Sequence, residues 1–167
     1  MPISERCIAL LMDNLRYAPE FGDRLSNHLS MALVALEKMG APPSRLESFT
    51  NTYITRLAPL SGTRMPSAAA SPREHLGDAN RFGEHLSFFT DAINDNGTEE
   101  TLFRWIPSLV PGLSGAGFHG MIRTAYAVLS GLEDEIAFAL AYWAGAYIAN
   151  PLTSNTERNS SHQDRER

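Results

Sequence analysis

The sequence has only one cysteine, Cys7, and one lysine, Lys38, among its 167 residues. A single cysteine excludes an internal disulfide and a cysteine-based metal motif, and it is compatible with a reducing cytoplasm. Cys7 lies in a short apolar run, so we expect it to be a small buried hydrophobic side chain. That run is too short for the core of a signal peptide. We therefore expect a cytoplasmic protein.

Basic residues and long apolar runs are also scarce. The formal net charge is -5 and the pI is near 5.5, which argues against a nucleic-acid partner. The most apolar segment, residues 136–149, has fourteen residues, whereas a helix needs about twenty to cross a bilayer. We expect no membrane partner and interpret this segment as a buried helix. Glu133, Asp134 and Glu135 precede it, where the helix dipole favours negative charge.

Several catalytic motifs are missing. The sequence has no GxSxG, no GxxxxGK[ST], no GxGxxG after a strand and no HExxH. The segment SGAGFHG is rich in glycine, but it follows a proline turn and not a strand, so a dinucleotide site of the usual kind is not expected.

Hydrophobic periodicity predicts an all-α fold, a single multi-helix domain of about seven helices over residues 1–149. The expected helices are 4–15, 22–39, 43–58, 78–95, 99–106, 116–130 and 132–149. Residues 59–73 form the expected long loop, and Thr98 is the expected cap after the break at residues 95–97. Trp105 and Pro107 are expected to end the helix before the turn at 111–112. Residues 150–167 are polar and are predicted to be a disordered tail.

The segment GAGFHGMIRTAYAVL, residues 115–129, has the character of a functional site. Helical spacing places His119, Arg123 and Tyr126 on one face. The clustered glycines lower helix stability, which suggests that another helix or a ligand approaches the backbone closely. The alternative is a tightly packed core helix.

A second histidine, His28, lies within an apolar helical pattern, residues 24–41. The pattern predicts that His28 lies on or beside the buried stripe of a helix. A buried imidazole needs partners for its nitrogens. Ser26, Asn27 and Ser30 could supply hydrogen bonds locally, and a bound metal ion is the alternative.

These two segments resemble the questin oxidase-like family over most of residues 8 to 145. The resemblance rests on Tyr17, Pro19 and Phe21 before the Asn27-His28 pair, and on Phe118-His119-Gly120, Ile122-Arg123 and Ala125-Tyr126. It implies a largely helical oxygenase that oxidises anthraquinone-like aromatic polyketides, by a Baeyer-Villiger type oxidation or by ring cleavage.

The resemblance also implies a non-haem iron held mainly by histidines, with a modified lysine among the ligands in part of the family, and NADPH as a possible cofactor. His28 and His119 are the candidate iron ligands by position. His75, His85 and His162 match no family motif, and nothing places a modified lysine at Lys38. Family members are about twice this length, so the remaining ligands would come from a downstream half. The change to a polar end at residue 150 suggests a truncated gene or an altered reading frame.

The site hypothesis gives roles to two further residues. Arg123 could stabilise a developing oxyanion, and Tyr126 could hydrogen-bond a quinone oxygen or an iron-bound intermediate. The alternatives are an ion pair of Arg123 with Asp13 or Glu20, and simple core packing of Tyr126.

Helices that would pack against a downstream half would leave apolar faces exposed, so we expect a homo-oligomer in which the helix over residues 136–149 is the covered surface. Three functional hypotheses remain open. The chain is a truncated or half-enzyme oxidoreductase, a non-catalytic helical binding or assembly module with a vestigial metal site, or one part of an enzyme rebuilt with a second copy or a separately encoded C-terminal half.

Overall fold

Helices dominate the computed structural model, which describes residues 2–60 and 71–149. The elements in chain order are α1 (Glu5–Asn14), β1 (Glu20–Phe21), β2 (Leu25–Ser26), α2 (Leu29–Lys38), α3 (Pro43–Tyr53), α4 (Phe82–Asn96), α5 (Thr98–Leu109), α6 (His119–Ser130) and α7 (Glu133–Gly145). Short 3-10 turns at Ile54–Arg56, Pro72–Glu74, Ala79–Arg81, Val110–Gly112 and Gly115–Phe118 join some of them. The predicted all-α class is confirmed.

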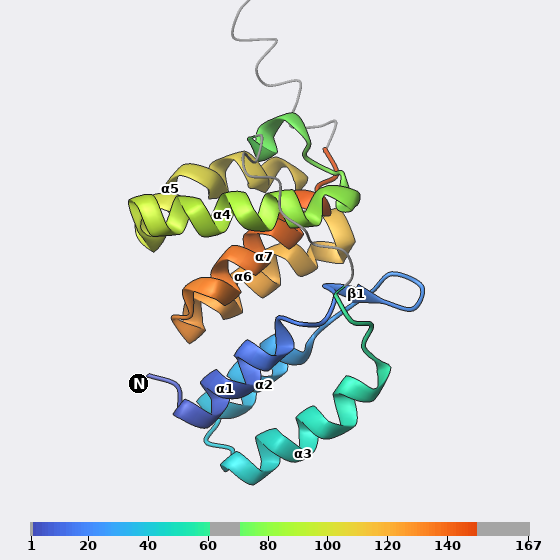
Figure 1. Ribbon diagram of the computed structural model, residues 1–167, viewed down its shortest axis with the longest axis vertical. Coiled ribbons are helices and arrows are strands. Elements are labelled where there is room, and N and C mark those ends of the chain that lie inside the picture. The colour runs from blue at the N-terminus through green and yellow to red at the C-terminus, as the bar shows by residue number, and fades with distance from the viewer. Residues whose placement is uncertain (1, 61–70, 150–167) are drawn as a thin grey trace, which may run out of the picture.

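The helices form three layers, with α6 and α7 in the middle (Figure 1). On one side α4 packs along α7 and α5 packs on α4; on the other side α2 packs on α6, followed by α1 and α3. The middle layer therefore connects an N-terminal group of helices to a later group.

Two hydrophobic clusters fill the spaces between these layers. The first contains Phe89, Trp105 and most of α7, and the second contains Leu11, Leu33 and their neighbours on α1, α2 and α3. Cys7 is completely buried in the second cluster, which confirms its predicted role. Burial raises the pKa of the Cys7 thiol to about 11, with a smaller contribution from Glu37, so the thiolate form is disfavoured.

Helix α7 is buried by its own chain. Every residue from Glu135 to Gly145 is buried, between α4 on one side and α6 on the other. The expectation that this helix is the surface covered by another subunit is therefore wrong. Its apolar character along the whole circumference reflects its central position in the fold. In the described part of the chain no helix is long and apolar enough to span a membrane.

Three local expectations need correction. The predicted helix 22–39 begins only at Leu29, because residues 20–26 form a two-stranded antiparallel hairpin in which Glu20 pairs with Ser26. Thr98 does not cap α5, since its hydroxyl donates to Glu133 instead. The helix that was expected to end at Trp105 and Pro107 continues, as α5, through Pro107 to Leu109.

The predicted disordered tail, 150–167, lies outside the described residues, as do residues 61–70 of the predicted long loop.

Candidate metal-binding site

The two candidate histidines lie in contact. Nε2 of His28 is 2.7 Å from Nε2 of His119, and the two rings are perpendicular, with centroids 4.6 Å apart. The residues are 91 positions apart in the sequence. The fold therefore brings together the pair that the family resemblance named, by packing α2 against α6.

His28 is held at the start of α2 by its neighbours. Its backbone N–H donates to the hydroxyl of Tyr53 at 3.1 Å, and the next N–H, of Leu29, donates to Oδ1 of Asn27 at 3.0 Å. The side chain of His28 is exposed and precedes the helix, so the expectation that it lies on or beside the buried stripe of a helix is wrong. The cause is the hairpin, whose second strand ends at Ser26, so that the helix begins only after His28. Exposure leaves this imidazole open to a metal ion or a second molecule.

His119 is oriented by an unusual backbone turn. Ala116, Gly117 and Phe118 have φ angles of 47°, 59° and 71°, and two of these three residues are not glycine. A left-handed conformation costs a non-glycine residue on the order of 1–2 kcal/mol. The turn places the carbonyl of Ala116 2.6 Å from Nδ1 of His119. Backbone strain of this kind is concentrated at functional sites in proteins.

The hydrogen bond to Ala116 selects one tautomer of His119. A carbonyl can only accept, so Nδ1 carries the proton and the lone pair of Nε2 points at His28. Metal-binding histidines are commonly held in this way, through a backbone carbonyl on the other ring nitrogen. Partial desolvation of the ring, and then the proximity of His119, lower the pKa of His28 from its ordinary value, while a hydrogen bond to the backbone of Ser26 opposes the shift. The shift favours the neutral imidazole, which is the form that binds a metal.

The pair fits part of a metal site. Two imidazole nitrogens at about 2.1 Å from one ion lie roughly 3 Å apart or slightly more, so the 2.7 Å pair would need to open by a few tenths of an ångström. However, within residues 2–60 and 71–149 there is no group of three or more His, Cys, Asp or Glu side chains that could hold a metal. The described residues supply two ligands, and non-haem iron sites with open positions usually have three.

Arg123 does not share the environment of His119. Its Nε and Nη2 donate to the two carboxylate oxygens of Glu135 at 2.8 and 3.0 Å, and its guanidinium lies 4.1 Å from the ring centroid of Phe138. Both charged side chains are closed off from solvent. Sequence reasoning foresaw an ion pair as the alternative, but named Asp13 or Glu20 as the partner, and this choice is wrong. An oxyanion role would require the guanidinium to leave Glu135.

Tyr126 packs against the N-terminal hydrophobic cluster, as its alternative interpretation expected, and it is half-buried. The three polar side chains that were predicted to share one face of α6 therefore contact two different parts of the fold. His119 and Tyr126 face the N-terminal helices, whereas Arg123 faces α7. The 40° offset between positions four apart on a helix is sufficient to separate them at a crowded interface.

The clustered glycines allow α7 and its following residues to approach. A Cβ on Gly120 would lie 2.7 Å from Cα of Trp143, and one on Gly115 would overlap the carbonyl of Ala146. This confirms the prediction of a close backbone approach, by another helix. Because the end of α7 covers Gly115 and Gly120, these glycines do not form an open phosphate-binding loop.

A buried hydroxyl connects α7 to the hairpin before His28. The hydroxyl of Tyr142 lies 2.7 Å from Oγ of Ser26 and donates to Oε1 of Glu20 at 3.1 Å. Burial raises the pKa of Tyr142 to about 12. Sequence reasoning missed this contact, although a tyrosine within an otherwise apolar helix indicates that its hydroxyl has a partner.

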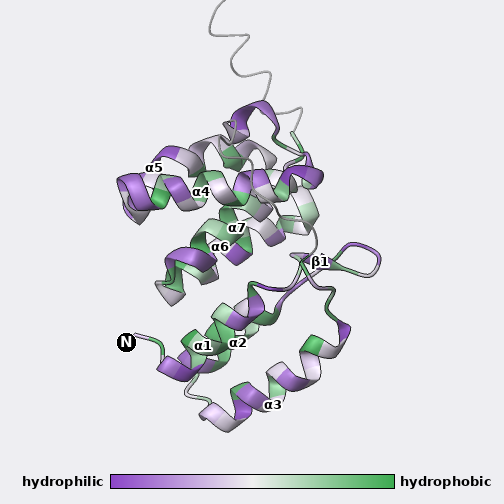
Figure 2. Cartoon of the chain, viewed as in Figure 1, coloured by the Kyte–Doolittle hydropathy of each residue, from purple (hydrophilic) through white to green (hydrophobic). Residues whose placement is uncertain are grey.

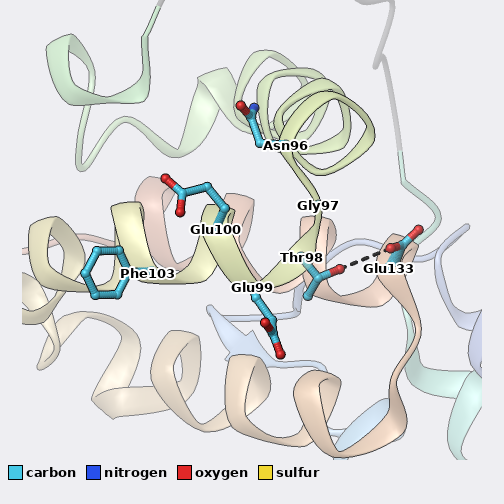
Figure 3. A pocket seen from close by; sticks show the side chains of 7 residues that line it. All are labelled: Asn96, Gly97, Thr98, Glu99, Glu100, Phe103 and Glu133. Carbon is cyan, nitrogen blue, oxygen red and sulfur yellow. Dashed lines mark hydrogen bonds between the residues drawn. The ribbon is translucent and has the colours of Figure 1, made fainter.

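An acidic depression lies elsewhere on the surface, where α5 begins beside the start of α7. Figure 3 shows its lining residues, Asn96, Gly97, Thr98, Glu99, Glu100, Phe103 and Glu133. The carboxylates of Glu99, Glu100 and Glu133 point in different directions, and Glu133 accepts a hydrogen bond from Thr98 at 3.1 Å. None of the predicted site residues lines this depression.

The fold and the histidine pair define a protein of the all-α class with a candidate metal site of two imidazole nitrogens. The family model described as questin oxidase-like matches residues 25–167, and the chain belongs to this family. The match begins after Tyr17, Pro19 and Phe21, and it includes the polar end at 150–167, which sequence analysis separated from the family-like core. No curated protein and no solved structure matches the chain significantly.

Proposed function

We propose that this protein is an oxygen-dependent oxidoreductase of the questin oxidase-like type, in which His28 and His119 are two ligands of a non-haem iron. The proposed substrate is an anthraquinone-like aromatic polyketide, oxidised by oxygen insertion or ring cleavage. The observation that supports it most is the convergence of the two Nε2 atoms in a chain of this family. Iron, when bound, would supply the activation of dioxygen.

The protein's own groups prepare the two nitrogens for this role. The Ala116 carbonyl keeps the proton of His119 on Nδ1, and the Tyr53 hydroxyl fixes the backbone of His28. A protonated imidazolium has no free lone pair for a metal ion, so metal affinity is expected to fall as the pH decreases.

Tyr126 is the proposed hydrogen-bond donor to a substrate oxygen, because it follows His119 by two helical turns on α6 and is only half-buried. Arg123 would contribute indirectly, by holding α6 against α7 through Glu135. NADPH remains a possible electron donor from the resemblance alone.

Metal content tests the assignment. The full chain is loaded anaerobically with Fe²⁺, desalted and analysed by inductively coupled plasma mass spectrometry. We expect retained iron that is lost in the His28→Ala, His119→Ala double variant and kept in a His75→Ala control, since His75 lies outside the pair. Quinone and anthrone substrates are then compared by oxygen consumption. Iron retention that is equal in all three proteins would contradict the assignment.

The second candidate is a non-catalytic binding or assembly module with a vestigial metal site. The observation in its favour is that the described residues supply only two ligands. A folded wild-type protein that holds no specific metal, alone or mixed with a separately encoded C-terminal half, would favour this function. Metal retained only after such mixing would favour a rebuilt enzyme.

A further inference from the structure

Two residues between the hairpin and α2 belong to no helix or strand. Asn27 and His28 follow the end of β2 at Ser26 and precede the start of α2 at Leu29. The hairpin residues before them, 22–25, are exposed, and Figure 2 shows the hairpin loop extending away from the helices. The imidazole of His28 is exposed as well. Apolar packing therefore does little to hold this imidazole, and its position depends on contacts of another kind.

A contact from α7 holds the residue two positions before His28. The hydroxyl of Tyr142 lies 2.7 Å from Oγ of Ser26 and donates to Oε1 of Glu20 at 3.1 Å. Glu20 and Ser26 are paired across the hairpin, and Tyr142 is 4% exposed. One buried phenol therefore attaches both strands of the hairpin to the middle layer.

A contact from α1 holds the residue directly before His28. Nδ2 of Asn27 donates to Oδ1 of Asn14, the last residue of α1, at 3.0 Å and to the carbonyl of Ala18 at 3.3 Å. Oδ1 of Asn27 accepts from the N–H of Leu29 at 3.0 Å. Asn14 and Asn27 are each 1% exposed, so water cannot easily replace these hydrogen bonds.

A contact from α3 holds His28 itself. The hydroxyl of Tyr53, the last residue of α3, accepts from the backbone N–H of His28 at 3.1 Å. The ring of Tyr53 stacks on Phe49, with centroids 5.6 Å apart, and meets the edge of Phe21 at 6.4 Å. Three helices that are distant in the sequence thus hold three consecutive residues, 26–28.

The opposite imidazole is held by its own segment. His119 begins α6, and its Nδ1 is 2.6 Å from the carbonyl of Ala116. His28 depends instead on side chains from α1, α3 and α7. The two Nε2 atoms are 2.7 Å apart, and groups of a functional site need to be held within about 0.5 Å of their working geometry. A small shift of the 26–28 backbone would therefore disturb the pair.

We propose that Asn14, Tyr53 and Tyr142 form a clamp that positions His28 against His119. The three are positioning residues, because they act through the backbone of residues 26–28. The importance of the pair rests on the proposed function, but the clamp itself belongs to the chain without metal. Since each member comes from a different helix, the pair assembles only when α1, α3 and α7 are all in place.

Contacts between the two imidazole rings test the clamp. The full chain is prepared without added metal, with hydrogen on its histidine rings and deuterium elsewhere, and the nuclear Overhauser effect between His28 and His119 is measured. Single His28→Gln and His119→Gln variants assign the signals. The wild type should show a cross-peak, because the ring centroids are 4.6 Å apart.

Two conservative variants each remove one clamp hydroxyl and keep the ring, namely Tyr53→Phe and Tyr142→Phe. Each should weaken the cross-peak roughly twofold, because the effect falls with the sixth power of distance and a displacement of about 0.5 Å is sufficient. Tyr53 is only half-buried, so Tyr53→Phe tests the clamp even where Tyr142→Phe fails to fold.

The matched control is Thr101→Val. The buried hydroxyl of Thr101 donates to the carbonyls of Ala92 and Gly97 at 3.0 and 2.8 Å, where α4 meets α5. Its removal costs stability by the same mechanism as removal of the Tyr142 hydroxyl, but it does not touch residues 26–28. The control should keep the full cross-peak, and circular dichroism should show that it folds.

The outcomes distinguish the clamp from the proposed function. An unchanged cross-peak in the folded tyrosine variants would overturn the clamp, and so would an equal loss in Thr101→Val, since general loosening would then explain it. A chain whose cross-peak responds as expected but that retains no iron would keep the clamp and overturn the proposed function. Histidine-dependent iron with a cross-peak insensitive to both tyrosines would do the reverse. No cross-peak in the wild type would overturn both.

Discussion

Arg123 of α6 and Glu135 of α7 bind each other through two parallel hydrogen bonds at a position that solvent does not reach. The pair fixes the relative position of the two helices in the middle layer, and α6 begins with His119. The remaining terminal nitrogen, Nη1 of Arg123, is buried and has no hydrogen-bond partner among the described residues. The face of Phe138 beneath the guanidinium offsets part of this cost.

Breaking this pair from one side should be strongly destabilising. Glu135→Gln leaves a buried guanidinium without its counter-charge, and we expect the free energy of unfolding to fall by about 3–5 kcal/mol. Arg6→Gln, which breaks the exposed pair with Glu47, is the matched control and should cost about 0–1 kcal/mol. Urea denaturation followed by circular dichroism measures both. An equal loss in the free energy of unfolding for the two variants would mean that the buried pair contributes no more to stability than the exposed pair.

Adding one methyl group to Gly120 should force α6 and α7 apart. The new Cβ would lie 2.7 Å from Cα of Trp143, and overpacking of this kind typically costs about 1–3 kcal/mol. Gly145→Ala is the matched control, because its Cβ would be 3.4 Å from the nearest atom, Cα of Ala79. Thermal unfolding of the two variants compares them. A Gly120→Ala protein as stable as the control would show that the helices can separate at little cost.

Acid should destabilise the fold through His85. This residue of α4 is 1% exposed, and burial lowers its pKa below the usual value, against the opposing effect of Glu84, Asp78 and a hydrogen bond to the backbone of His75. Because the unfolded state binds the proton more readily, stability should be complete above about pH 6.5 and should fall as the pH decreases through the folded pKa.

The measurement is urea denaturation at several pH values for the wild type and for His85→Gln. The loss of stability between neutral and mildly acidic pH should be smaller in the variant, which has no proton to bind at this position. A variant that loses the same stability as the wild type over this range would assign the acid sensitivity to other groups.

Tyr142 and Ser26 should be energetically coupled. Removing the Tyr142 hydroxyl leaves the buried Ser26 hydroxyl without this bond, which typically costs about 1–3 kcal/mol, whereas removing the Ser26 hydroxyl leaves Tyr142 its bond to Glu20 and should cost less. The double variant Tyr142→Phe, Ser26→Ala should therefore lose less stability than the sum of the single variants. A double-mutant cycle by chemical denaturation gives the coupling free energy. Additive losses would show that the 2.7 Å contact is not a working hydrogen bond in solution.

The same tyrosine offers a direct spectroscopic check. Burial raises the pKa of Tyr142 to about 12, so this phenol should ionise at higher pH than an ordinary tyrosine, whose pKa is near 10. Difference absorbance of the tyrosinate against a Tyr142→Phe protein isolates its titration. A pKa near 10 for Tyr142 would contradict its buried, hydrogen-bonded position.

Periodicity alone was enough to predict most of the helices, because their apolar residues recur at helical spacing. It missed the hairpin at residues 20–26, since strands of two residues are too short to show an alternating pattern. It also placed the start of α6 too early. Ala116 and Phe118 adopt left-handed conformations that only glycine is expected to favour, so no residue type marks the turn.

The candidate site was only partly predictable for a related reason. His28 and His119 were paired by family resemblance, and their contact depends on how α2 packs on α6, which no local pattern specifies. The partner of Arg123 could not be selected among many carboxylates. The structure distinguishes Glu135, which is the acidic residue of the first turn of α7 that points into the helix interface, whereas Glu133 and Asp134 are exposed.

The contact between His28 and His119 closes a loop of 91 residues. One histidine belongs to the N-terminal segment and the other to the middle layer, so an ion bound between them would cross-link these two parts of the fold. Because such an ion would bind the folded chain and not the unfolded one, occupancy and melting temperature would rise together. If the proposed ion binds, the melting temperature of this protein would therefore report how much metal its surroundings supply.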